Sequence, residues 1–369
     1  MLNDCSFMSK FHTVKIAEVR RETPDTVSIA LDIPEEQRKD FSYVQGQYLT
    51  FRVFIDGEDV RRTYSICSSP LDKELRVAVK KMDGGRFSTW ANEKLKAGEP
   101  VEVMPPMGNF FSKVNPAQKK HYIAFAAGSG ITPVMSILKT VLAVEKESEF
   151  TLIYGNRGSS SIIFREELEA LKNKYMSRFT LYHVFSREAT EFPVFNGRID
   201  NEKCGQLFRS LVDVQSGDEF FICGPGDMIV AVSGELEKAG IDKSKIHYEL
   251  FTSPSDAGNQ LNHAPKKEIK KQYAGDKSTV KVILDGIHTT FELAAEGESI
   301  LDAAHRHGAD APYACKGAVC CTCRAKVREG KVEMALNYSL TDEEIANGFV
   351  LTCQAHPVTE TVVVDFDEA

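Results

Sequence analysis

The sequence predicts a multidomain α+β protein in which an antiparallel β-barrel, an α/β domain with a parallel sheet and a small cysteine-rich domain follow one another. Three observations predict this fold class. Short runs rich in β-branched and aromatic residues fill the first third of the chain, strands alternate with helices in the middle, and five of the nine cysteines lie in the last quarter. A chain of 369 residues is also too long for one ordinary domain.

The first segment, from about residue 11 to 112, is β-rich. Prolines and an Asp-Gly pair separate its apolar runs, which are 12–19, 26–33, 47–55, 63–67 and 75–80. Several short strands at this spacing predict a small antiparallel barrel. We expect one helix to interrupt it, from Ser88 to Lys96, with the serine as its N-cap and Gly98 past its end.

From residue 121 the pattern changes to alternating strands and helices. The predicted strands are 122–127, 150–154, 180–185, 219–223 and 245–250. The predicted helices are 133–144, 164–174, 201–211 and 227–239. This alternation predicts a parallel sheet with helices on both of its faces.

The last segment begins after a predicted linker. Residues 253–275 contain Pro, Gly, Asn and four lysines without apolar periodicity. The predicted domains are therefore 8–114, 115–252 and 276–369. In the third, we expect a hairpin from 279–284 and 289–293, a helix at 299–307 and a closing strand at 361–366.

The surplus negative charge of the chain lies entirely in this last segment. Residues 276–369 hold 16 Asp and Glu against eight Lys and Arg, which equals the net charge of −8 of the whole chain. Such a surface makes nucleic acid a poor partner and favours a basic docking face on another protein, although an acidic surface kept for solubility explains the charge equally well. Neither a signal sequence nor a membrane-spanning run is apparent, so we expect a cytoplasmic protein without a membrane partner.

Four of the clustered cysteines have the spacing of a plant-type [2Fe–2S] site, Cys315-x4-Cys320-x2-Cys323 and then 29 residues to Cys353. Each iron needs tetrahedral sulfur, two from bridging sulfides and two from protein. A structural zinc site also accepts four cysteines, but zinc knuckles usually pair two short Cys-x2–4-Cys units. Cys321 is out of register and is expected to be a small buried residue, although it could replace Cys320 or Cys323 in a slipped loop.

Residues that suit a flavin occur in the predicted barrel. Tyr64 can supply an apolar wall, Ser65 a hydroxyl near the flavin N5, and Arg62 a cation for the pyrophosphate. Alone, this Arg-x-Tyr-Ser segment is more typical of an ordinary β-strand than of a flavin site.

A glycine pair, Gly84 and Gly85, follows 20 residues later and opens the only predicted helix of the barrel, beside Ser88. Glycines before a helix N-terminus form an anion site suited to a pyrophosphate, although a plain turn with a cap is the alternative. The two motifs together predict a bound flavin, and the family resemblance described below implies that it is FAD.

Two glycine-rich turns of the α/β segment suit a nicotinamide dinucleotide, because both follow predicted strands and precede predicted helices. The first contains Gly128, Gly130 and Thr132, with a proline in place of the third glycine of the usual motif. The second contains Cys223 and Gly224.

A third segment of the α/β domain bears on the choice of nicotinamide cofactor. Ser186 and Arg187, at the end of the third predicted strand, could hold the 2′-phosphate of NADPH or form an exposed loop. NADPH is therefore expected, with NADH as the alternative.

These motifs, in this order, give residues 11–252 a resemblance to the ferredoxin–NADP⁺ reductase superfamily. The cysteine loop narrows the resemblance to reductases with a C-terminal plant-type ferredoxin domain, which implies a β-grasp-like fold there. More closely, the whole chain resembles the reductase subunits of bacterial phenylacetyl-CoA 1,2-epoxidases. The segments that carry this resemblance are 61–67, 154–157, 197–200, 312–317, 337–340 and 362–367.

The resemblance implies roles for individual residues. Tyr64 would pack on the isoalloxazine with Ser65 near N5, and Phe251 would cover the other flavin face until nicotinamide displaces it. The residues expected at the pyrophosphate are Arg62, Gly85 and Ser88, and those expected beside the nicotinamide are Gly130, Thr132, Cys223 and Gly224.

The resemblance also implies a function. Electrons would pass from NADPH through FAD and the [2Fe–2S] cluster to a diiron oxygenase component that docks near the acidic domain. The alternatives are a reductase for another acceptor, such as a ring-hydroxylating dioxygenase or a hybrid-cluster protein, and a non-catalytic redox-sensing module.

Overall fold

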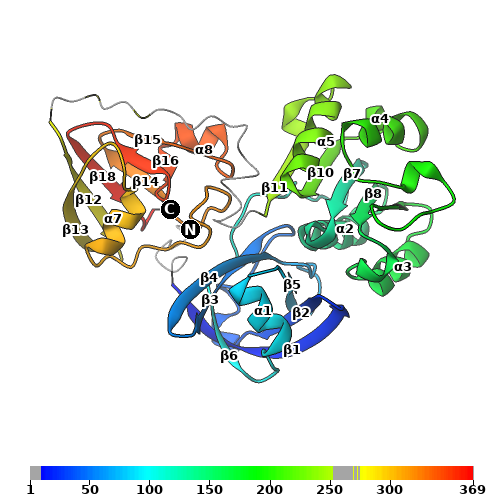
Figure 1. The fold of residues 1–369 in the computed structure, drawn as a ribbon, viewed down its shortest axis with the longest axis horizontal. Helices are drawn as coiled ribbons and strands as arrows, with labels where there is room; N and C mark the ends of the chain where they lie inside the picture. The colour runs from blue at the N-terminus through cyan, green and yellow to red at the C-terminus, as the bar shows by residue number, and fades with distance from the viewer. Residues whose placement is uncertain (1–9, 252–268, 270–271, 273–274, 369) are drawn as a thin grey trace.

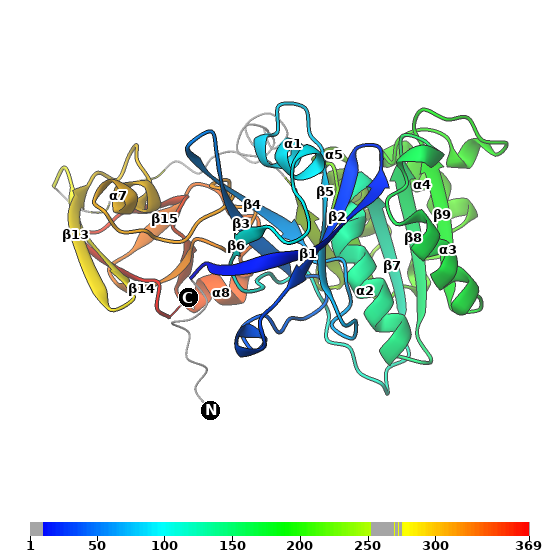
Figure 2. The same ribbon diagram turned by 90° about the horizontal axis from the view of Figure 1, so that it is seen from below.

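The computed structural model describes residues 10–251, 269, 272 and 275–368. The chain forms three parts, with the barrel between the α/β domain on one side and the C-terminal domain on the other (Figures 1 and 2). The predicted linker at 253–275 lies almost entirely outside the described residues. None of the helices in the described residues is both long and apolar enough to cross a membrane.

The barrel is an antiparallel sheet with the strand order β4-β3-β6-β1-β2-β5. Its strands are β1 (His12–Thr23), β2 (Thr26–Asp32), β3 (Tyr48–Ile55), β4 (Glu58–Ser65), β5 (Leu75–Lys80) and β6 (Pro100–Val103). A bridge between Ile66 and Val77 joins the two edge strands and closes the sheet. Apolar side chains at alternate strand positions, such as Leu49 and Phe51, fill the interior.

The barrel helix differs from the prediction at both ends. Helix α1 spans Arg86–Glu93, and its N-cap is Gly85. The predicted N-cap role of Ser88 is therefore wrong. Ser88 lies inside the first turn, where its hydroxyl accepts a hydrogen bond from the Met82 N–H at 3.1 Å. A serine side chain can hold the preceding loop in this way as well as cap the helix itself.

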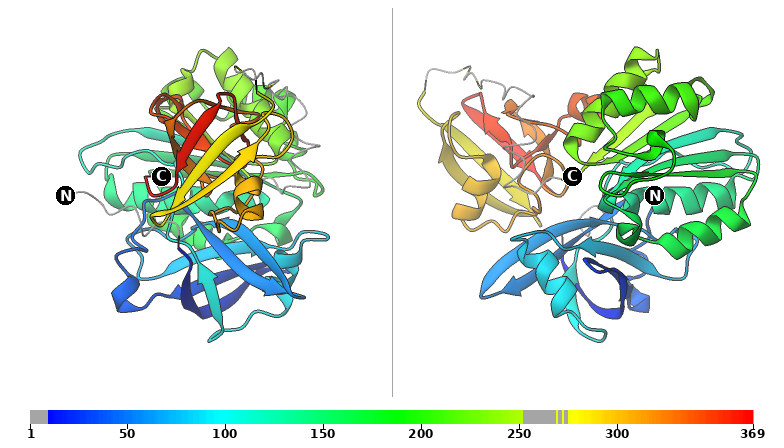
Figure 3. Two further views of the ribbon diagram at one scale, coloured as in Figure 1. Left: turned by 90° about the vertical axis from the view of Figure 1, so that its left-hand side faces the viewer. Right: turned by 45° about the vertical axis from the view of Figure 1, so that its right-hand side comes forward.

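The α/β domain has the predicted parallel sheet, with the strand order β11-β10-β7-β8-β9. The strands are β7 (His121–Ala127), β8 (Glu149–Asn156), β9 (Phe179–Phe185), β10 (Glu219–Gly224) and β11 (Ile246–Leu250). The helices are α2 (Ile131–Val144), α3 (Arg165–Lys174), α4 (Asn201–Ser210) and α5 (Gly226–Lys238). Two separate apolar clusters, one under α2 and α3 and one under α4 and α5, cover the two faces of the sheet (Figure 3).

The C-terminal domain is a mixed sheet, β13-β12-β18-β14-β16, beside a two-stranded sheet of β15 and β17. Its strands are β12 (Ser278–Leu284), β13 (Ile287–Leu293), β14 (Arg324–Glu329), β15 (Val332–Met334), β16 (Phe349–Leu351), β17 (Ala355–Pro357) and β18 (Thr361–Asp365). Its helices are α7 (Ile300–Arg306) and α8 (Asp342–Ala346). The cysteine loop connects α7 to β14, and Cys353 lies two residues after the end of β16.

Candidate functional site

The four predicted cluster cysteines lie together in two pairs. The sulfurs of Cys315 and Cys320 are 3.1 Å apart. Cys353 is the hydrogen-bond partner of Cys323 and raises its pKa. All four side chains are buried. The segment of Cys353 is fixed beside Cys323 by Thr352, whose hydroxyl donates to the Cys323 carbonyl at 2.8 Å.

The backbone of the loop turns its N–H groups toward the sulfurs. Lys316 and Ala318 have φ angles of 51° and 61°, in the left-handed region. The Gly317 N–H donates to the Cys315 sulfur at 3.3 Å. The Cys320 thiol and these backbone N–H groups lower the pKa of Cys315, which favours the thiolate, the form in which a cysteine can bind a metal.

The arrangement fits a two-iron cluster better than zinc. Within the described residues, no three His, Cys, Asp or Glu side chains are placed to hold a single ion. Zinc needs four ligands around one point, whereas each iron of a [2Fe–2S] cluster takes two protein sulfurs. Cys321 is set apart, because its sulfur points to the Ser339 carbonyl at 3.6 Å and burial raises its pKa to about 11.

The predicted flavin residues lie at the end of β4. Tyr64 packs against Phe87 with ring centroids 5.1 Å apart. Arg62 donates only to the Arg61 carbonyl, at 2.7 Å, and makes no ion pair among the described residues. Such a guanidinium is available to a phosphate.

Ser65 makes a contact that the sequence does not predict. Its hydroxyl donates to Glu249 Oε2 at 2.8 Å, across 184 positions of the chain. Burial raises the pKa of Glu249 to about 7. A carboxyl that titrates near neutrality, hydrogen-bonded to a hydroxyl, can hold or release a proton at this position. The only sequence signal for Glu249 is an acidic residue at the end of a strand.

The glycine pair lies at the N-terminus of α1, with Gly85 as the N-cap. Gly84 has a φ angle of 71°, and its position faces open space. At Gly85 an added Cβ would lie 2.4 Å from the Ser88 hydroxyl, so a larger residue at this helix start would displace that hydroxyl. Arg86, next along, pairs with Glu58 and is therefore not free to bind a phosphate.

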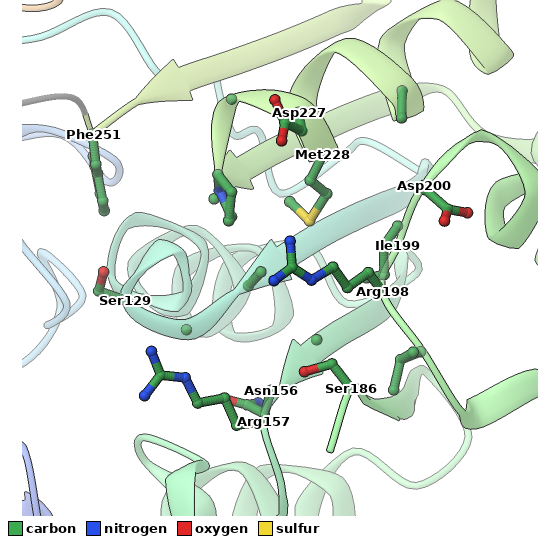
Figure 4. Close-up of a pocket in the computed structure, with 18 of the residues that line it drawn as sticks. Ser129, Asn156, Arg157, Ser186, Arg198, Ile199, Asp200, Asp227, Met228 and Phe251 are labelled. Atoms are coloured by element: carbon green, nitrogen blue, oxygen red, sulfur yellow. The ribbon is translucent and has the colours of Figure 1, made fainter. Parts of the chain in front are cut away.

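A cavity of about 660 Å³ lies between the barrel and the α/β domain (Figure 4). Four of the predicted nicotinamide residues line it, Gly128, Ser186, Arg187 and Gly224, whereas Gly130, Thr132 and Cys223 are not among its lining residues. Gly130 packs so closely on β10 that an added Cβ would lie 2.0 Å from the Cys223 carbonyl oxygen. The two glycine-rich turns are thus brought together at the carboxyl ends of β7 and β10. Cys223 is fully buried, which raises the pKa of its thiol.

Other predicted residues take their places around the same cavity. Gly128, Gly224 and Phe251 line it. Phe251 follows β11, and 41% of its surface is exposed, as suits a ring that covers a ligand. Thr132 is buried, and its hydroxyl donates to the Ser129 carbonyl at 2.9 Å, so it supports the turn from beneath.

The rim of the cavity is basic. Ser186 and Arg187 are exposed there, and the Arg187 N–H donates to the Arg157 carbonyl at 2.9 Å. The side chains of Arg157 and Arg198 point into the cavity from two other loops (Figure 4). The amide of Asn156, 8% exposed, has no hydrogen-bond partner among the described residues. Sequence reasoning assigned no role to these last three residues.

Comparisons with known proteins agree with this three-part geometry. Residues 13–111 match the oxidoreductase FAD-binding domain family, residues 125–234 the oxidoreductase NAD-binding domain family, and residues 282–358 the 2Fe-2S iron-sulfur cluster binding domain family. The chain is 46% identical to one of the subunits of 1,2-phenylacetyl-CoA epoxidase from Escherichia coli, over 98% of this chain and 99% of that protein. It belongs to the family of oxygenase reductase components.

Other members of the family are also similar over nearly their full lengths. The ferredoxin reductase component of 3-ketosteroid-9-alpha-monooxygenase from Rhodococcus rhodochrous is 35% identical over 95% of each chain. Among solved structures, phthalate dioxygenase reductase shares the fold, with a TM-score of 0.56 and 22% identity over 96% of this chain and 98% of that one.

These matches establish an oxidoreductase that uses FAD, a nicotinamide dinucleotide and a [2Fe–2S] cluster. We refer to the C-terminal domain from here as the ferredoxin domain.

Proposed function

We propose that this reductase oxidises NADPH and supplies electrons to the oxygenase of a phenylacetyl-CoA epoxidase. The observation that carries the proposal is the 46% identity to the Escherichia coli epoxidase component over almost the whole of both chains. The identity to the 3-ketosteroid monooxygenase component is lower, at 35%, which makes that kind of oxygenase the second candidate acceptor.

The proposal assigns each group of site residues to one cofactor. The bound flavin takes a hydride as an electron pair, and the cluster passes electrons on singly. We assign the cluster to Cys315, Cys320, Cys323 and Cys353. We assign FAD to Arg62, Tyr64, Ser65, Gly84, Gly85, Ser88 and Phe251. We assign the nicotinamide dinucleotide to Gly128, Gly130, Thr132, Ser186, Arg187, Cys223 and Gly224.

In this assignment the protein acts by positioning and by proton control. Gly130 and Cys223 hold the two turns together, so that one ligand can lie across both. Ser65 can pass a proton between the flavin edge and Glu249, because its hydroxyl is 2.8 Å from the carboxylate. Phe251, at the cavity wall, excludes water from one side.

The basic rim supports NADPH as the preferred donor. Arg157, Arg187 and Arg198 converge on one cavity, and a guanidinium binds phosphate in a bidentate manner. We expect Arg187→Ala to lower kcat/KM for NADPH by about tenfold or more, because hydrogen bonds to charged groups contribute about 1.5–3 kcal/mol. The kcat/KM for NADH should change little. Arg165→Ala, which removes an exposed arginine paired with Glu169, is the control. Equal losses with both donors would contradict the preference.

The same proposal includes where the acceptor docks and where in the cell the protein works. The acceptor would dock on the ferredoxin domain, where Asp342 and Glu343 are exposed and Ile345 is 41% exposed on α8. A basic surface on the oxygenase fits these charges. The buried, unpaired thiols are compatible with work in the cytoplasm.

Reconstitution tests the proposed acceptor. The purified reductase is combined with the oxygenase core of a phenylacetyl-CoA epoxidase, and NADPH consumption is followed with and without phenylacetyl-CoA. We expect consumption that depends on both the core and the substrate. The oxygenase of a 3-ketosteroid monooxygenase with its steroid is the comparison. If NADPH consumption depends on substrate with that oxygenase and not with the epoxidase core, the reductase is assigned to the second acceptor.

A further inference from the structure

We propose that Tyr48 is a positioning residue for electron transfer within this reductase. Its phenol holds the cysteine loop of the ferredoxin domain against the strand pair that carries Ser65. The inference rests on the proposed assignment of the cluster to the four cysteines and of the flavin to Tyr64 and Ser65.

One face of β3 presents a row of side chains to the ferredoxin domain. Tyr48, Thr50 and Arg52 occupy alternate positions of the strand, so all three point to the same side. The intervening Leu49 and Phe51 point into the barrel interior. Since the interior needs only one face of β3, the outer row is free to meet another domain.

Each member of the row has a partner in the ferredoxin domain. Tyr48 accepts a hydrogen bond from the Cys321 N–H at 2.9 Å. The hydroxyls of Thr50 and Thr322 are 3.2 Å apart. The guanidinium of Arg52 lies 4.0 Å from the carboxylate of Asp310. The barrel thus contacts consecutive residues of the loop that connects the cluster ligands Cys320 and Cys323.

Tyr48 lies closest to the ligands. It is 5% exposed and belongs to one small apolar cluster with Ala314, Cys315 and Cys320. Its ring position is fixed from behind, because a Cβ added to Gly108 would lie 2.9 Å from the ring. A fixed ring carries the hydroxyl to one place, where it meets the amide next to Cys320.

The backbone of Tyr48 pairs with the strand that carries the predicted flavin residues. In the β3–β4 ladder Tyr48 pairs with Ser65, and Leu49 pairs with Tyr64. A single residue of the barrel therefore connects the predicted flavin edge to the predicted cluster. Electron transfer slows steeply as the distance between two centres grows, so a contact that holds this spacing controls the internal transfer step.

The hydroxyl is the part of Tyr48 that can be tested alone. The variant Tyr48→Phe keeps the ring and leaves the Cys321 N–H buried without an acceptor in the docked state. A buried unsatisfied donor costs enough to reduce the docked population by about tenfold. The control is Tyr43→Phe, which removes a phenol hydrogen bond to Ser68 at 2.9 Å within the same barrel. Thr50→Val removes the second contact of the row without changing its shape.

Three measurements on the full-length holoprotein follow these variants. In anaerobic single turnovers with NADPH, flavin reduction should keep its rate, while cluster reduction, followed by freeze-quench EPR, should slow by about tenfold in Tyr48→Phe. Hydrogen–deuterium exchange of the Cys321 amide should speed up by a similar factor. The EPR line shape of the chemically reduced cluster should change in Tyr48→Phe and not in Tyr43→Phe. Thr50→Val should also slow cluster reduction.

The outcomes separate the inference from the proposed function. If cluster reduction and Cys321 exchange in both Tyr48→Phe and Thr50→Val match the wild type, Tyr48 does not position the loop. The inference is also overturned if Tyr48→Phe slows flavin reduction as much as cluster reduction, because that indicates general damage. If the wild type shows no flavin reduced by NADPH or no EPR signal of a reduced cluster, the proposed function itself has failed.

Discussion

Cys320 and Cys321 are neighbours in the chain but lie in different surroundings. The sulfur of Cys320 is 3.1 Å from that of Cys315, whereas the sulfur of Cys321 points into the apolar core of the ferredoxin domain toward Ser339. The two adjacent thiols therefore allow a direct comparison, because one is proposed to bind iron and the other to fill space in the core.

We predict that Cys320→Ser loses the cluster and that Cys321→Ser keeps it. A serine hydroxyl is a hard oxygen ligand and replaces a thiolate poorly, whereas in the core it replaces a small side chain at a cost of about 1–3 kcal/mol. Iron and sulfide content and visible absorbance of the anaerobically purified proteins measure the difference. Equal loss in both variants would show that the loop has slipped and that Cys321 is a ligand.

Glu249 leads to a prediction about pH. Its pKa is raised from 4.5 to about 7 by burial, and the Ser65 hydrogen bond offsets part of this. Because the folded value exceeds the unfolded one, the protonated carboxyl stabilises the fold fully below pH 4.5, and this stability is lost as pH rises through 7. The residue as a whole is only partly buried, so the loss should be about 2 kcal/mol.

Glu249→Gln is uncharged at every pH and should not show this loss. The melting temperature of Glu249→Gln minus that of the wild type is therefore expected to grow between pH 5 and pH 8. Glu166→Gln, an exposed glutamate on α3, is the control and should give a constant difference. A constant difference for Glu249→Gln as well would show that the carboxyl stays ionised throughout.

The sequence predicts the site residues that belong to short motifs and misses those that depend on tertiary proximity. The cysteine spacing and the Arg-x-Tyr-Ser segment are local patterns, so they predicted residues that the fold brings together. No role was predicted for Glu249, Asn156 or Arg198, although Asn156 and Arg198 lie in segments that carry the family resemblance. Each lies at the end of a strand or in a loop, and only the assembled sheet shows that they face the same cavity or hydroxyl as the motif residues.

At the scale of elements, the turn at Gly128–Gly130 packs directly against the carboxyl end of β10. A Cβ on Gly130 would lie 2.0 Å from the Cys223 oxygen and 2.9 Å from the Gly224 nitrogen. Both contacts are backbone atoms, which cannot move without shifting a strand. The glycine is therefore required for the two turns to share one ligand.

We predict that Gly130→Ala destabilises the protein by about 1–3 kcal/mol, as overpacking does. It should also weaken NADP⁺ binding by about tenfold while leaving the FAD content unchanged, because the barrel is not involved. Gly234→Ala is the matched control. Gly234 lies within α5 with no atom within 4 Å of an added Cβ, so alanine should be neutral or slightly stabilising there. Unchanged NADP⁺ affinity in Gly130→Ala would contradict the role of the turn.

Regular elements with clear periodicity were predicted, and short ones were missed. All five strands of the α/β domain and its four helices lie where alternation predicts them. Strand β6, strands β14 to β17 and helix α8 had no prediction, because three to six residues give too little periodicity. Tertiary pairing places these strands: β6 pairs with the longer β1, and β15 and β17 pair with each other.

At the scale of the whole molecule, the ferredoxin domain docks with its cluster loop turned inward. Arg61 is 5% exposed, pairs with Asp310 at 3.2 Å and stacks on Tyr313 at 4.3 Å from its ring centroid. Thr50 and Thr322 are 1% and 2% exposed. The face of the cysteine loop that meets the barrel is therefore closed to other proteins in this arrangement. Under the proposed function, the docked domain would receive electrons, and delivery to an oxygenase through this face would require the domain to move away.

A cross-link that holds the docked arrangement tests this conclusion. The hydroxyls of Thr50 and Thr322 are 3.2 Å apart, so Thr50→Cys with Thr322→Cys places two sulfurs near the 2 Å separation of a disulfide. The oxidised double variant, verified by mass spectrometry, should still reduce its cluster with NADPH in single turnovers. Its turnover with the oxygenase should fall by about tenfold or more and recover when the disulfide is reduced. A tenfold shift in the docking equilibrium corresponds to about 1.4 kcal/mol, and a covalent cross-link holds the domain more strongly than that. The single-cysteine variants control for each substitution. Full oxygenase turnover by the cross-linked protein would mean that electrons leave through another face of the ferredoxin domain, and that docking on the barrel and docking on the partner are compatible.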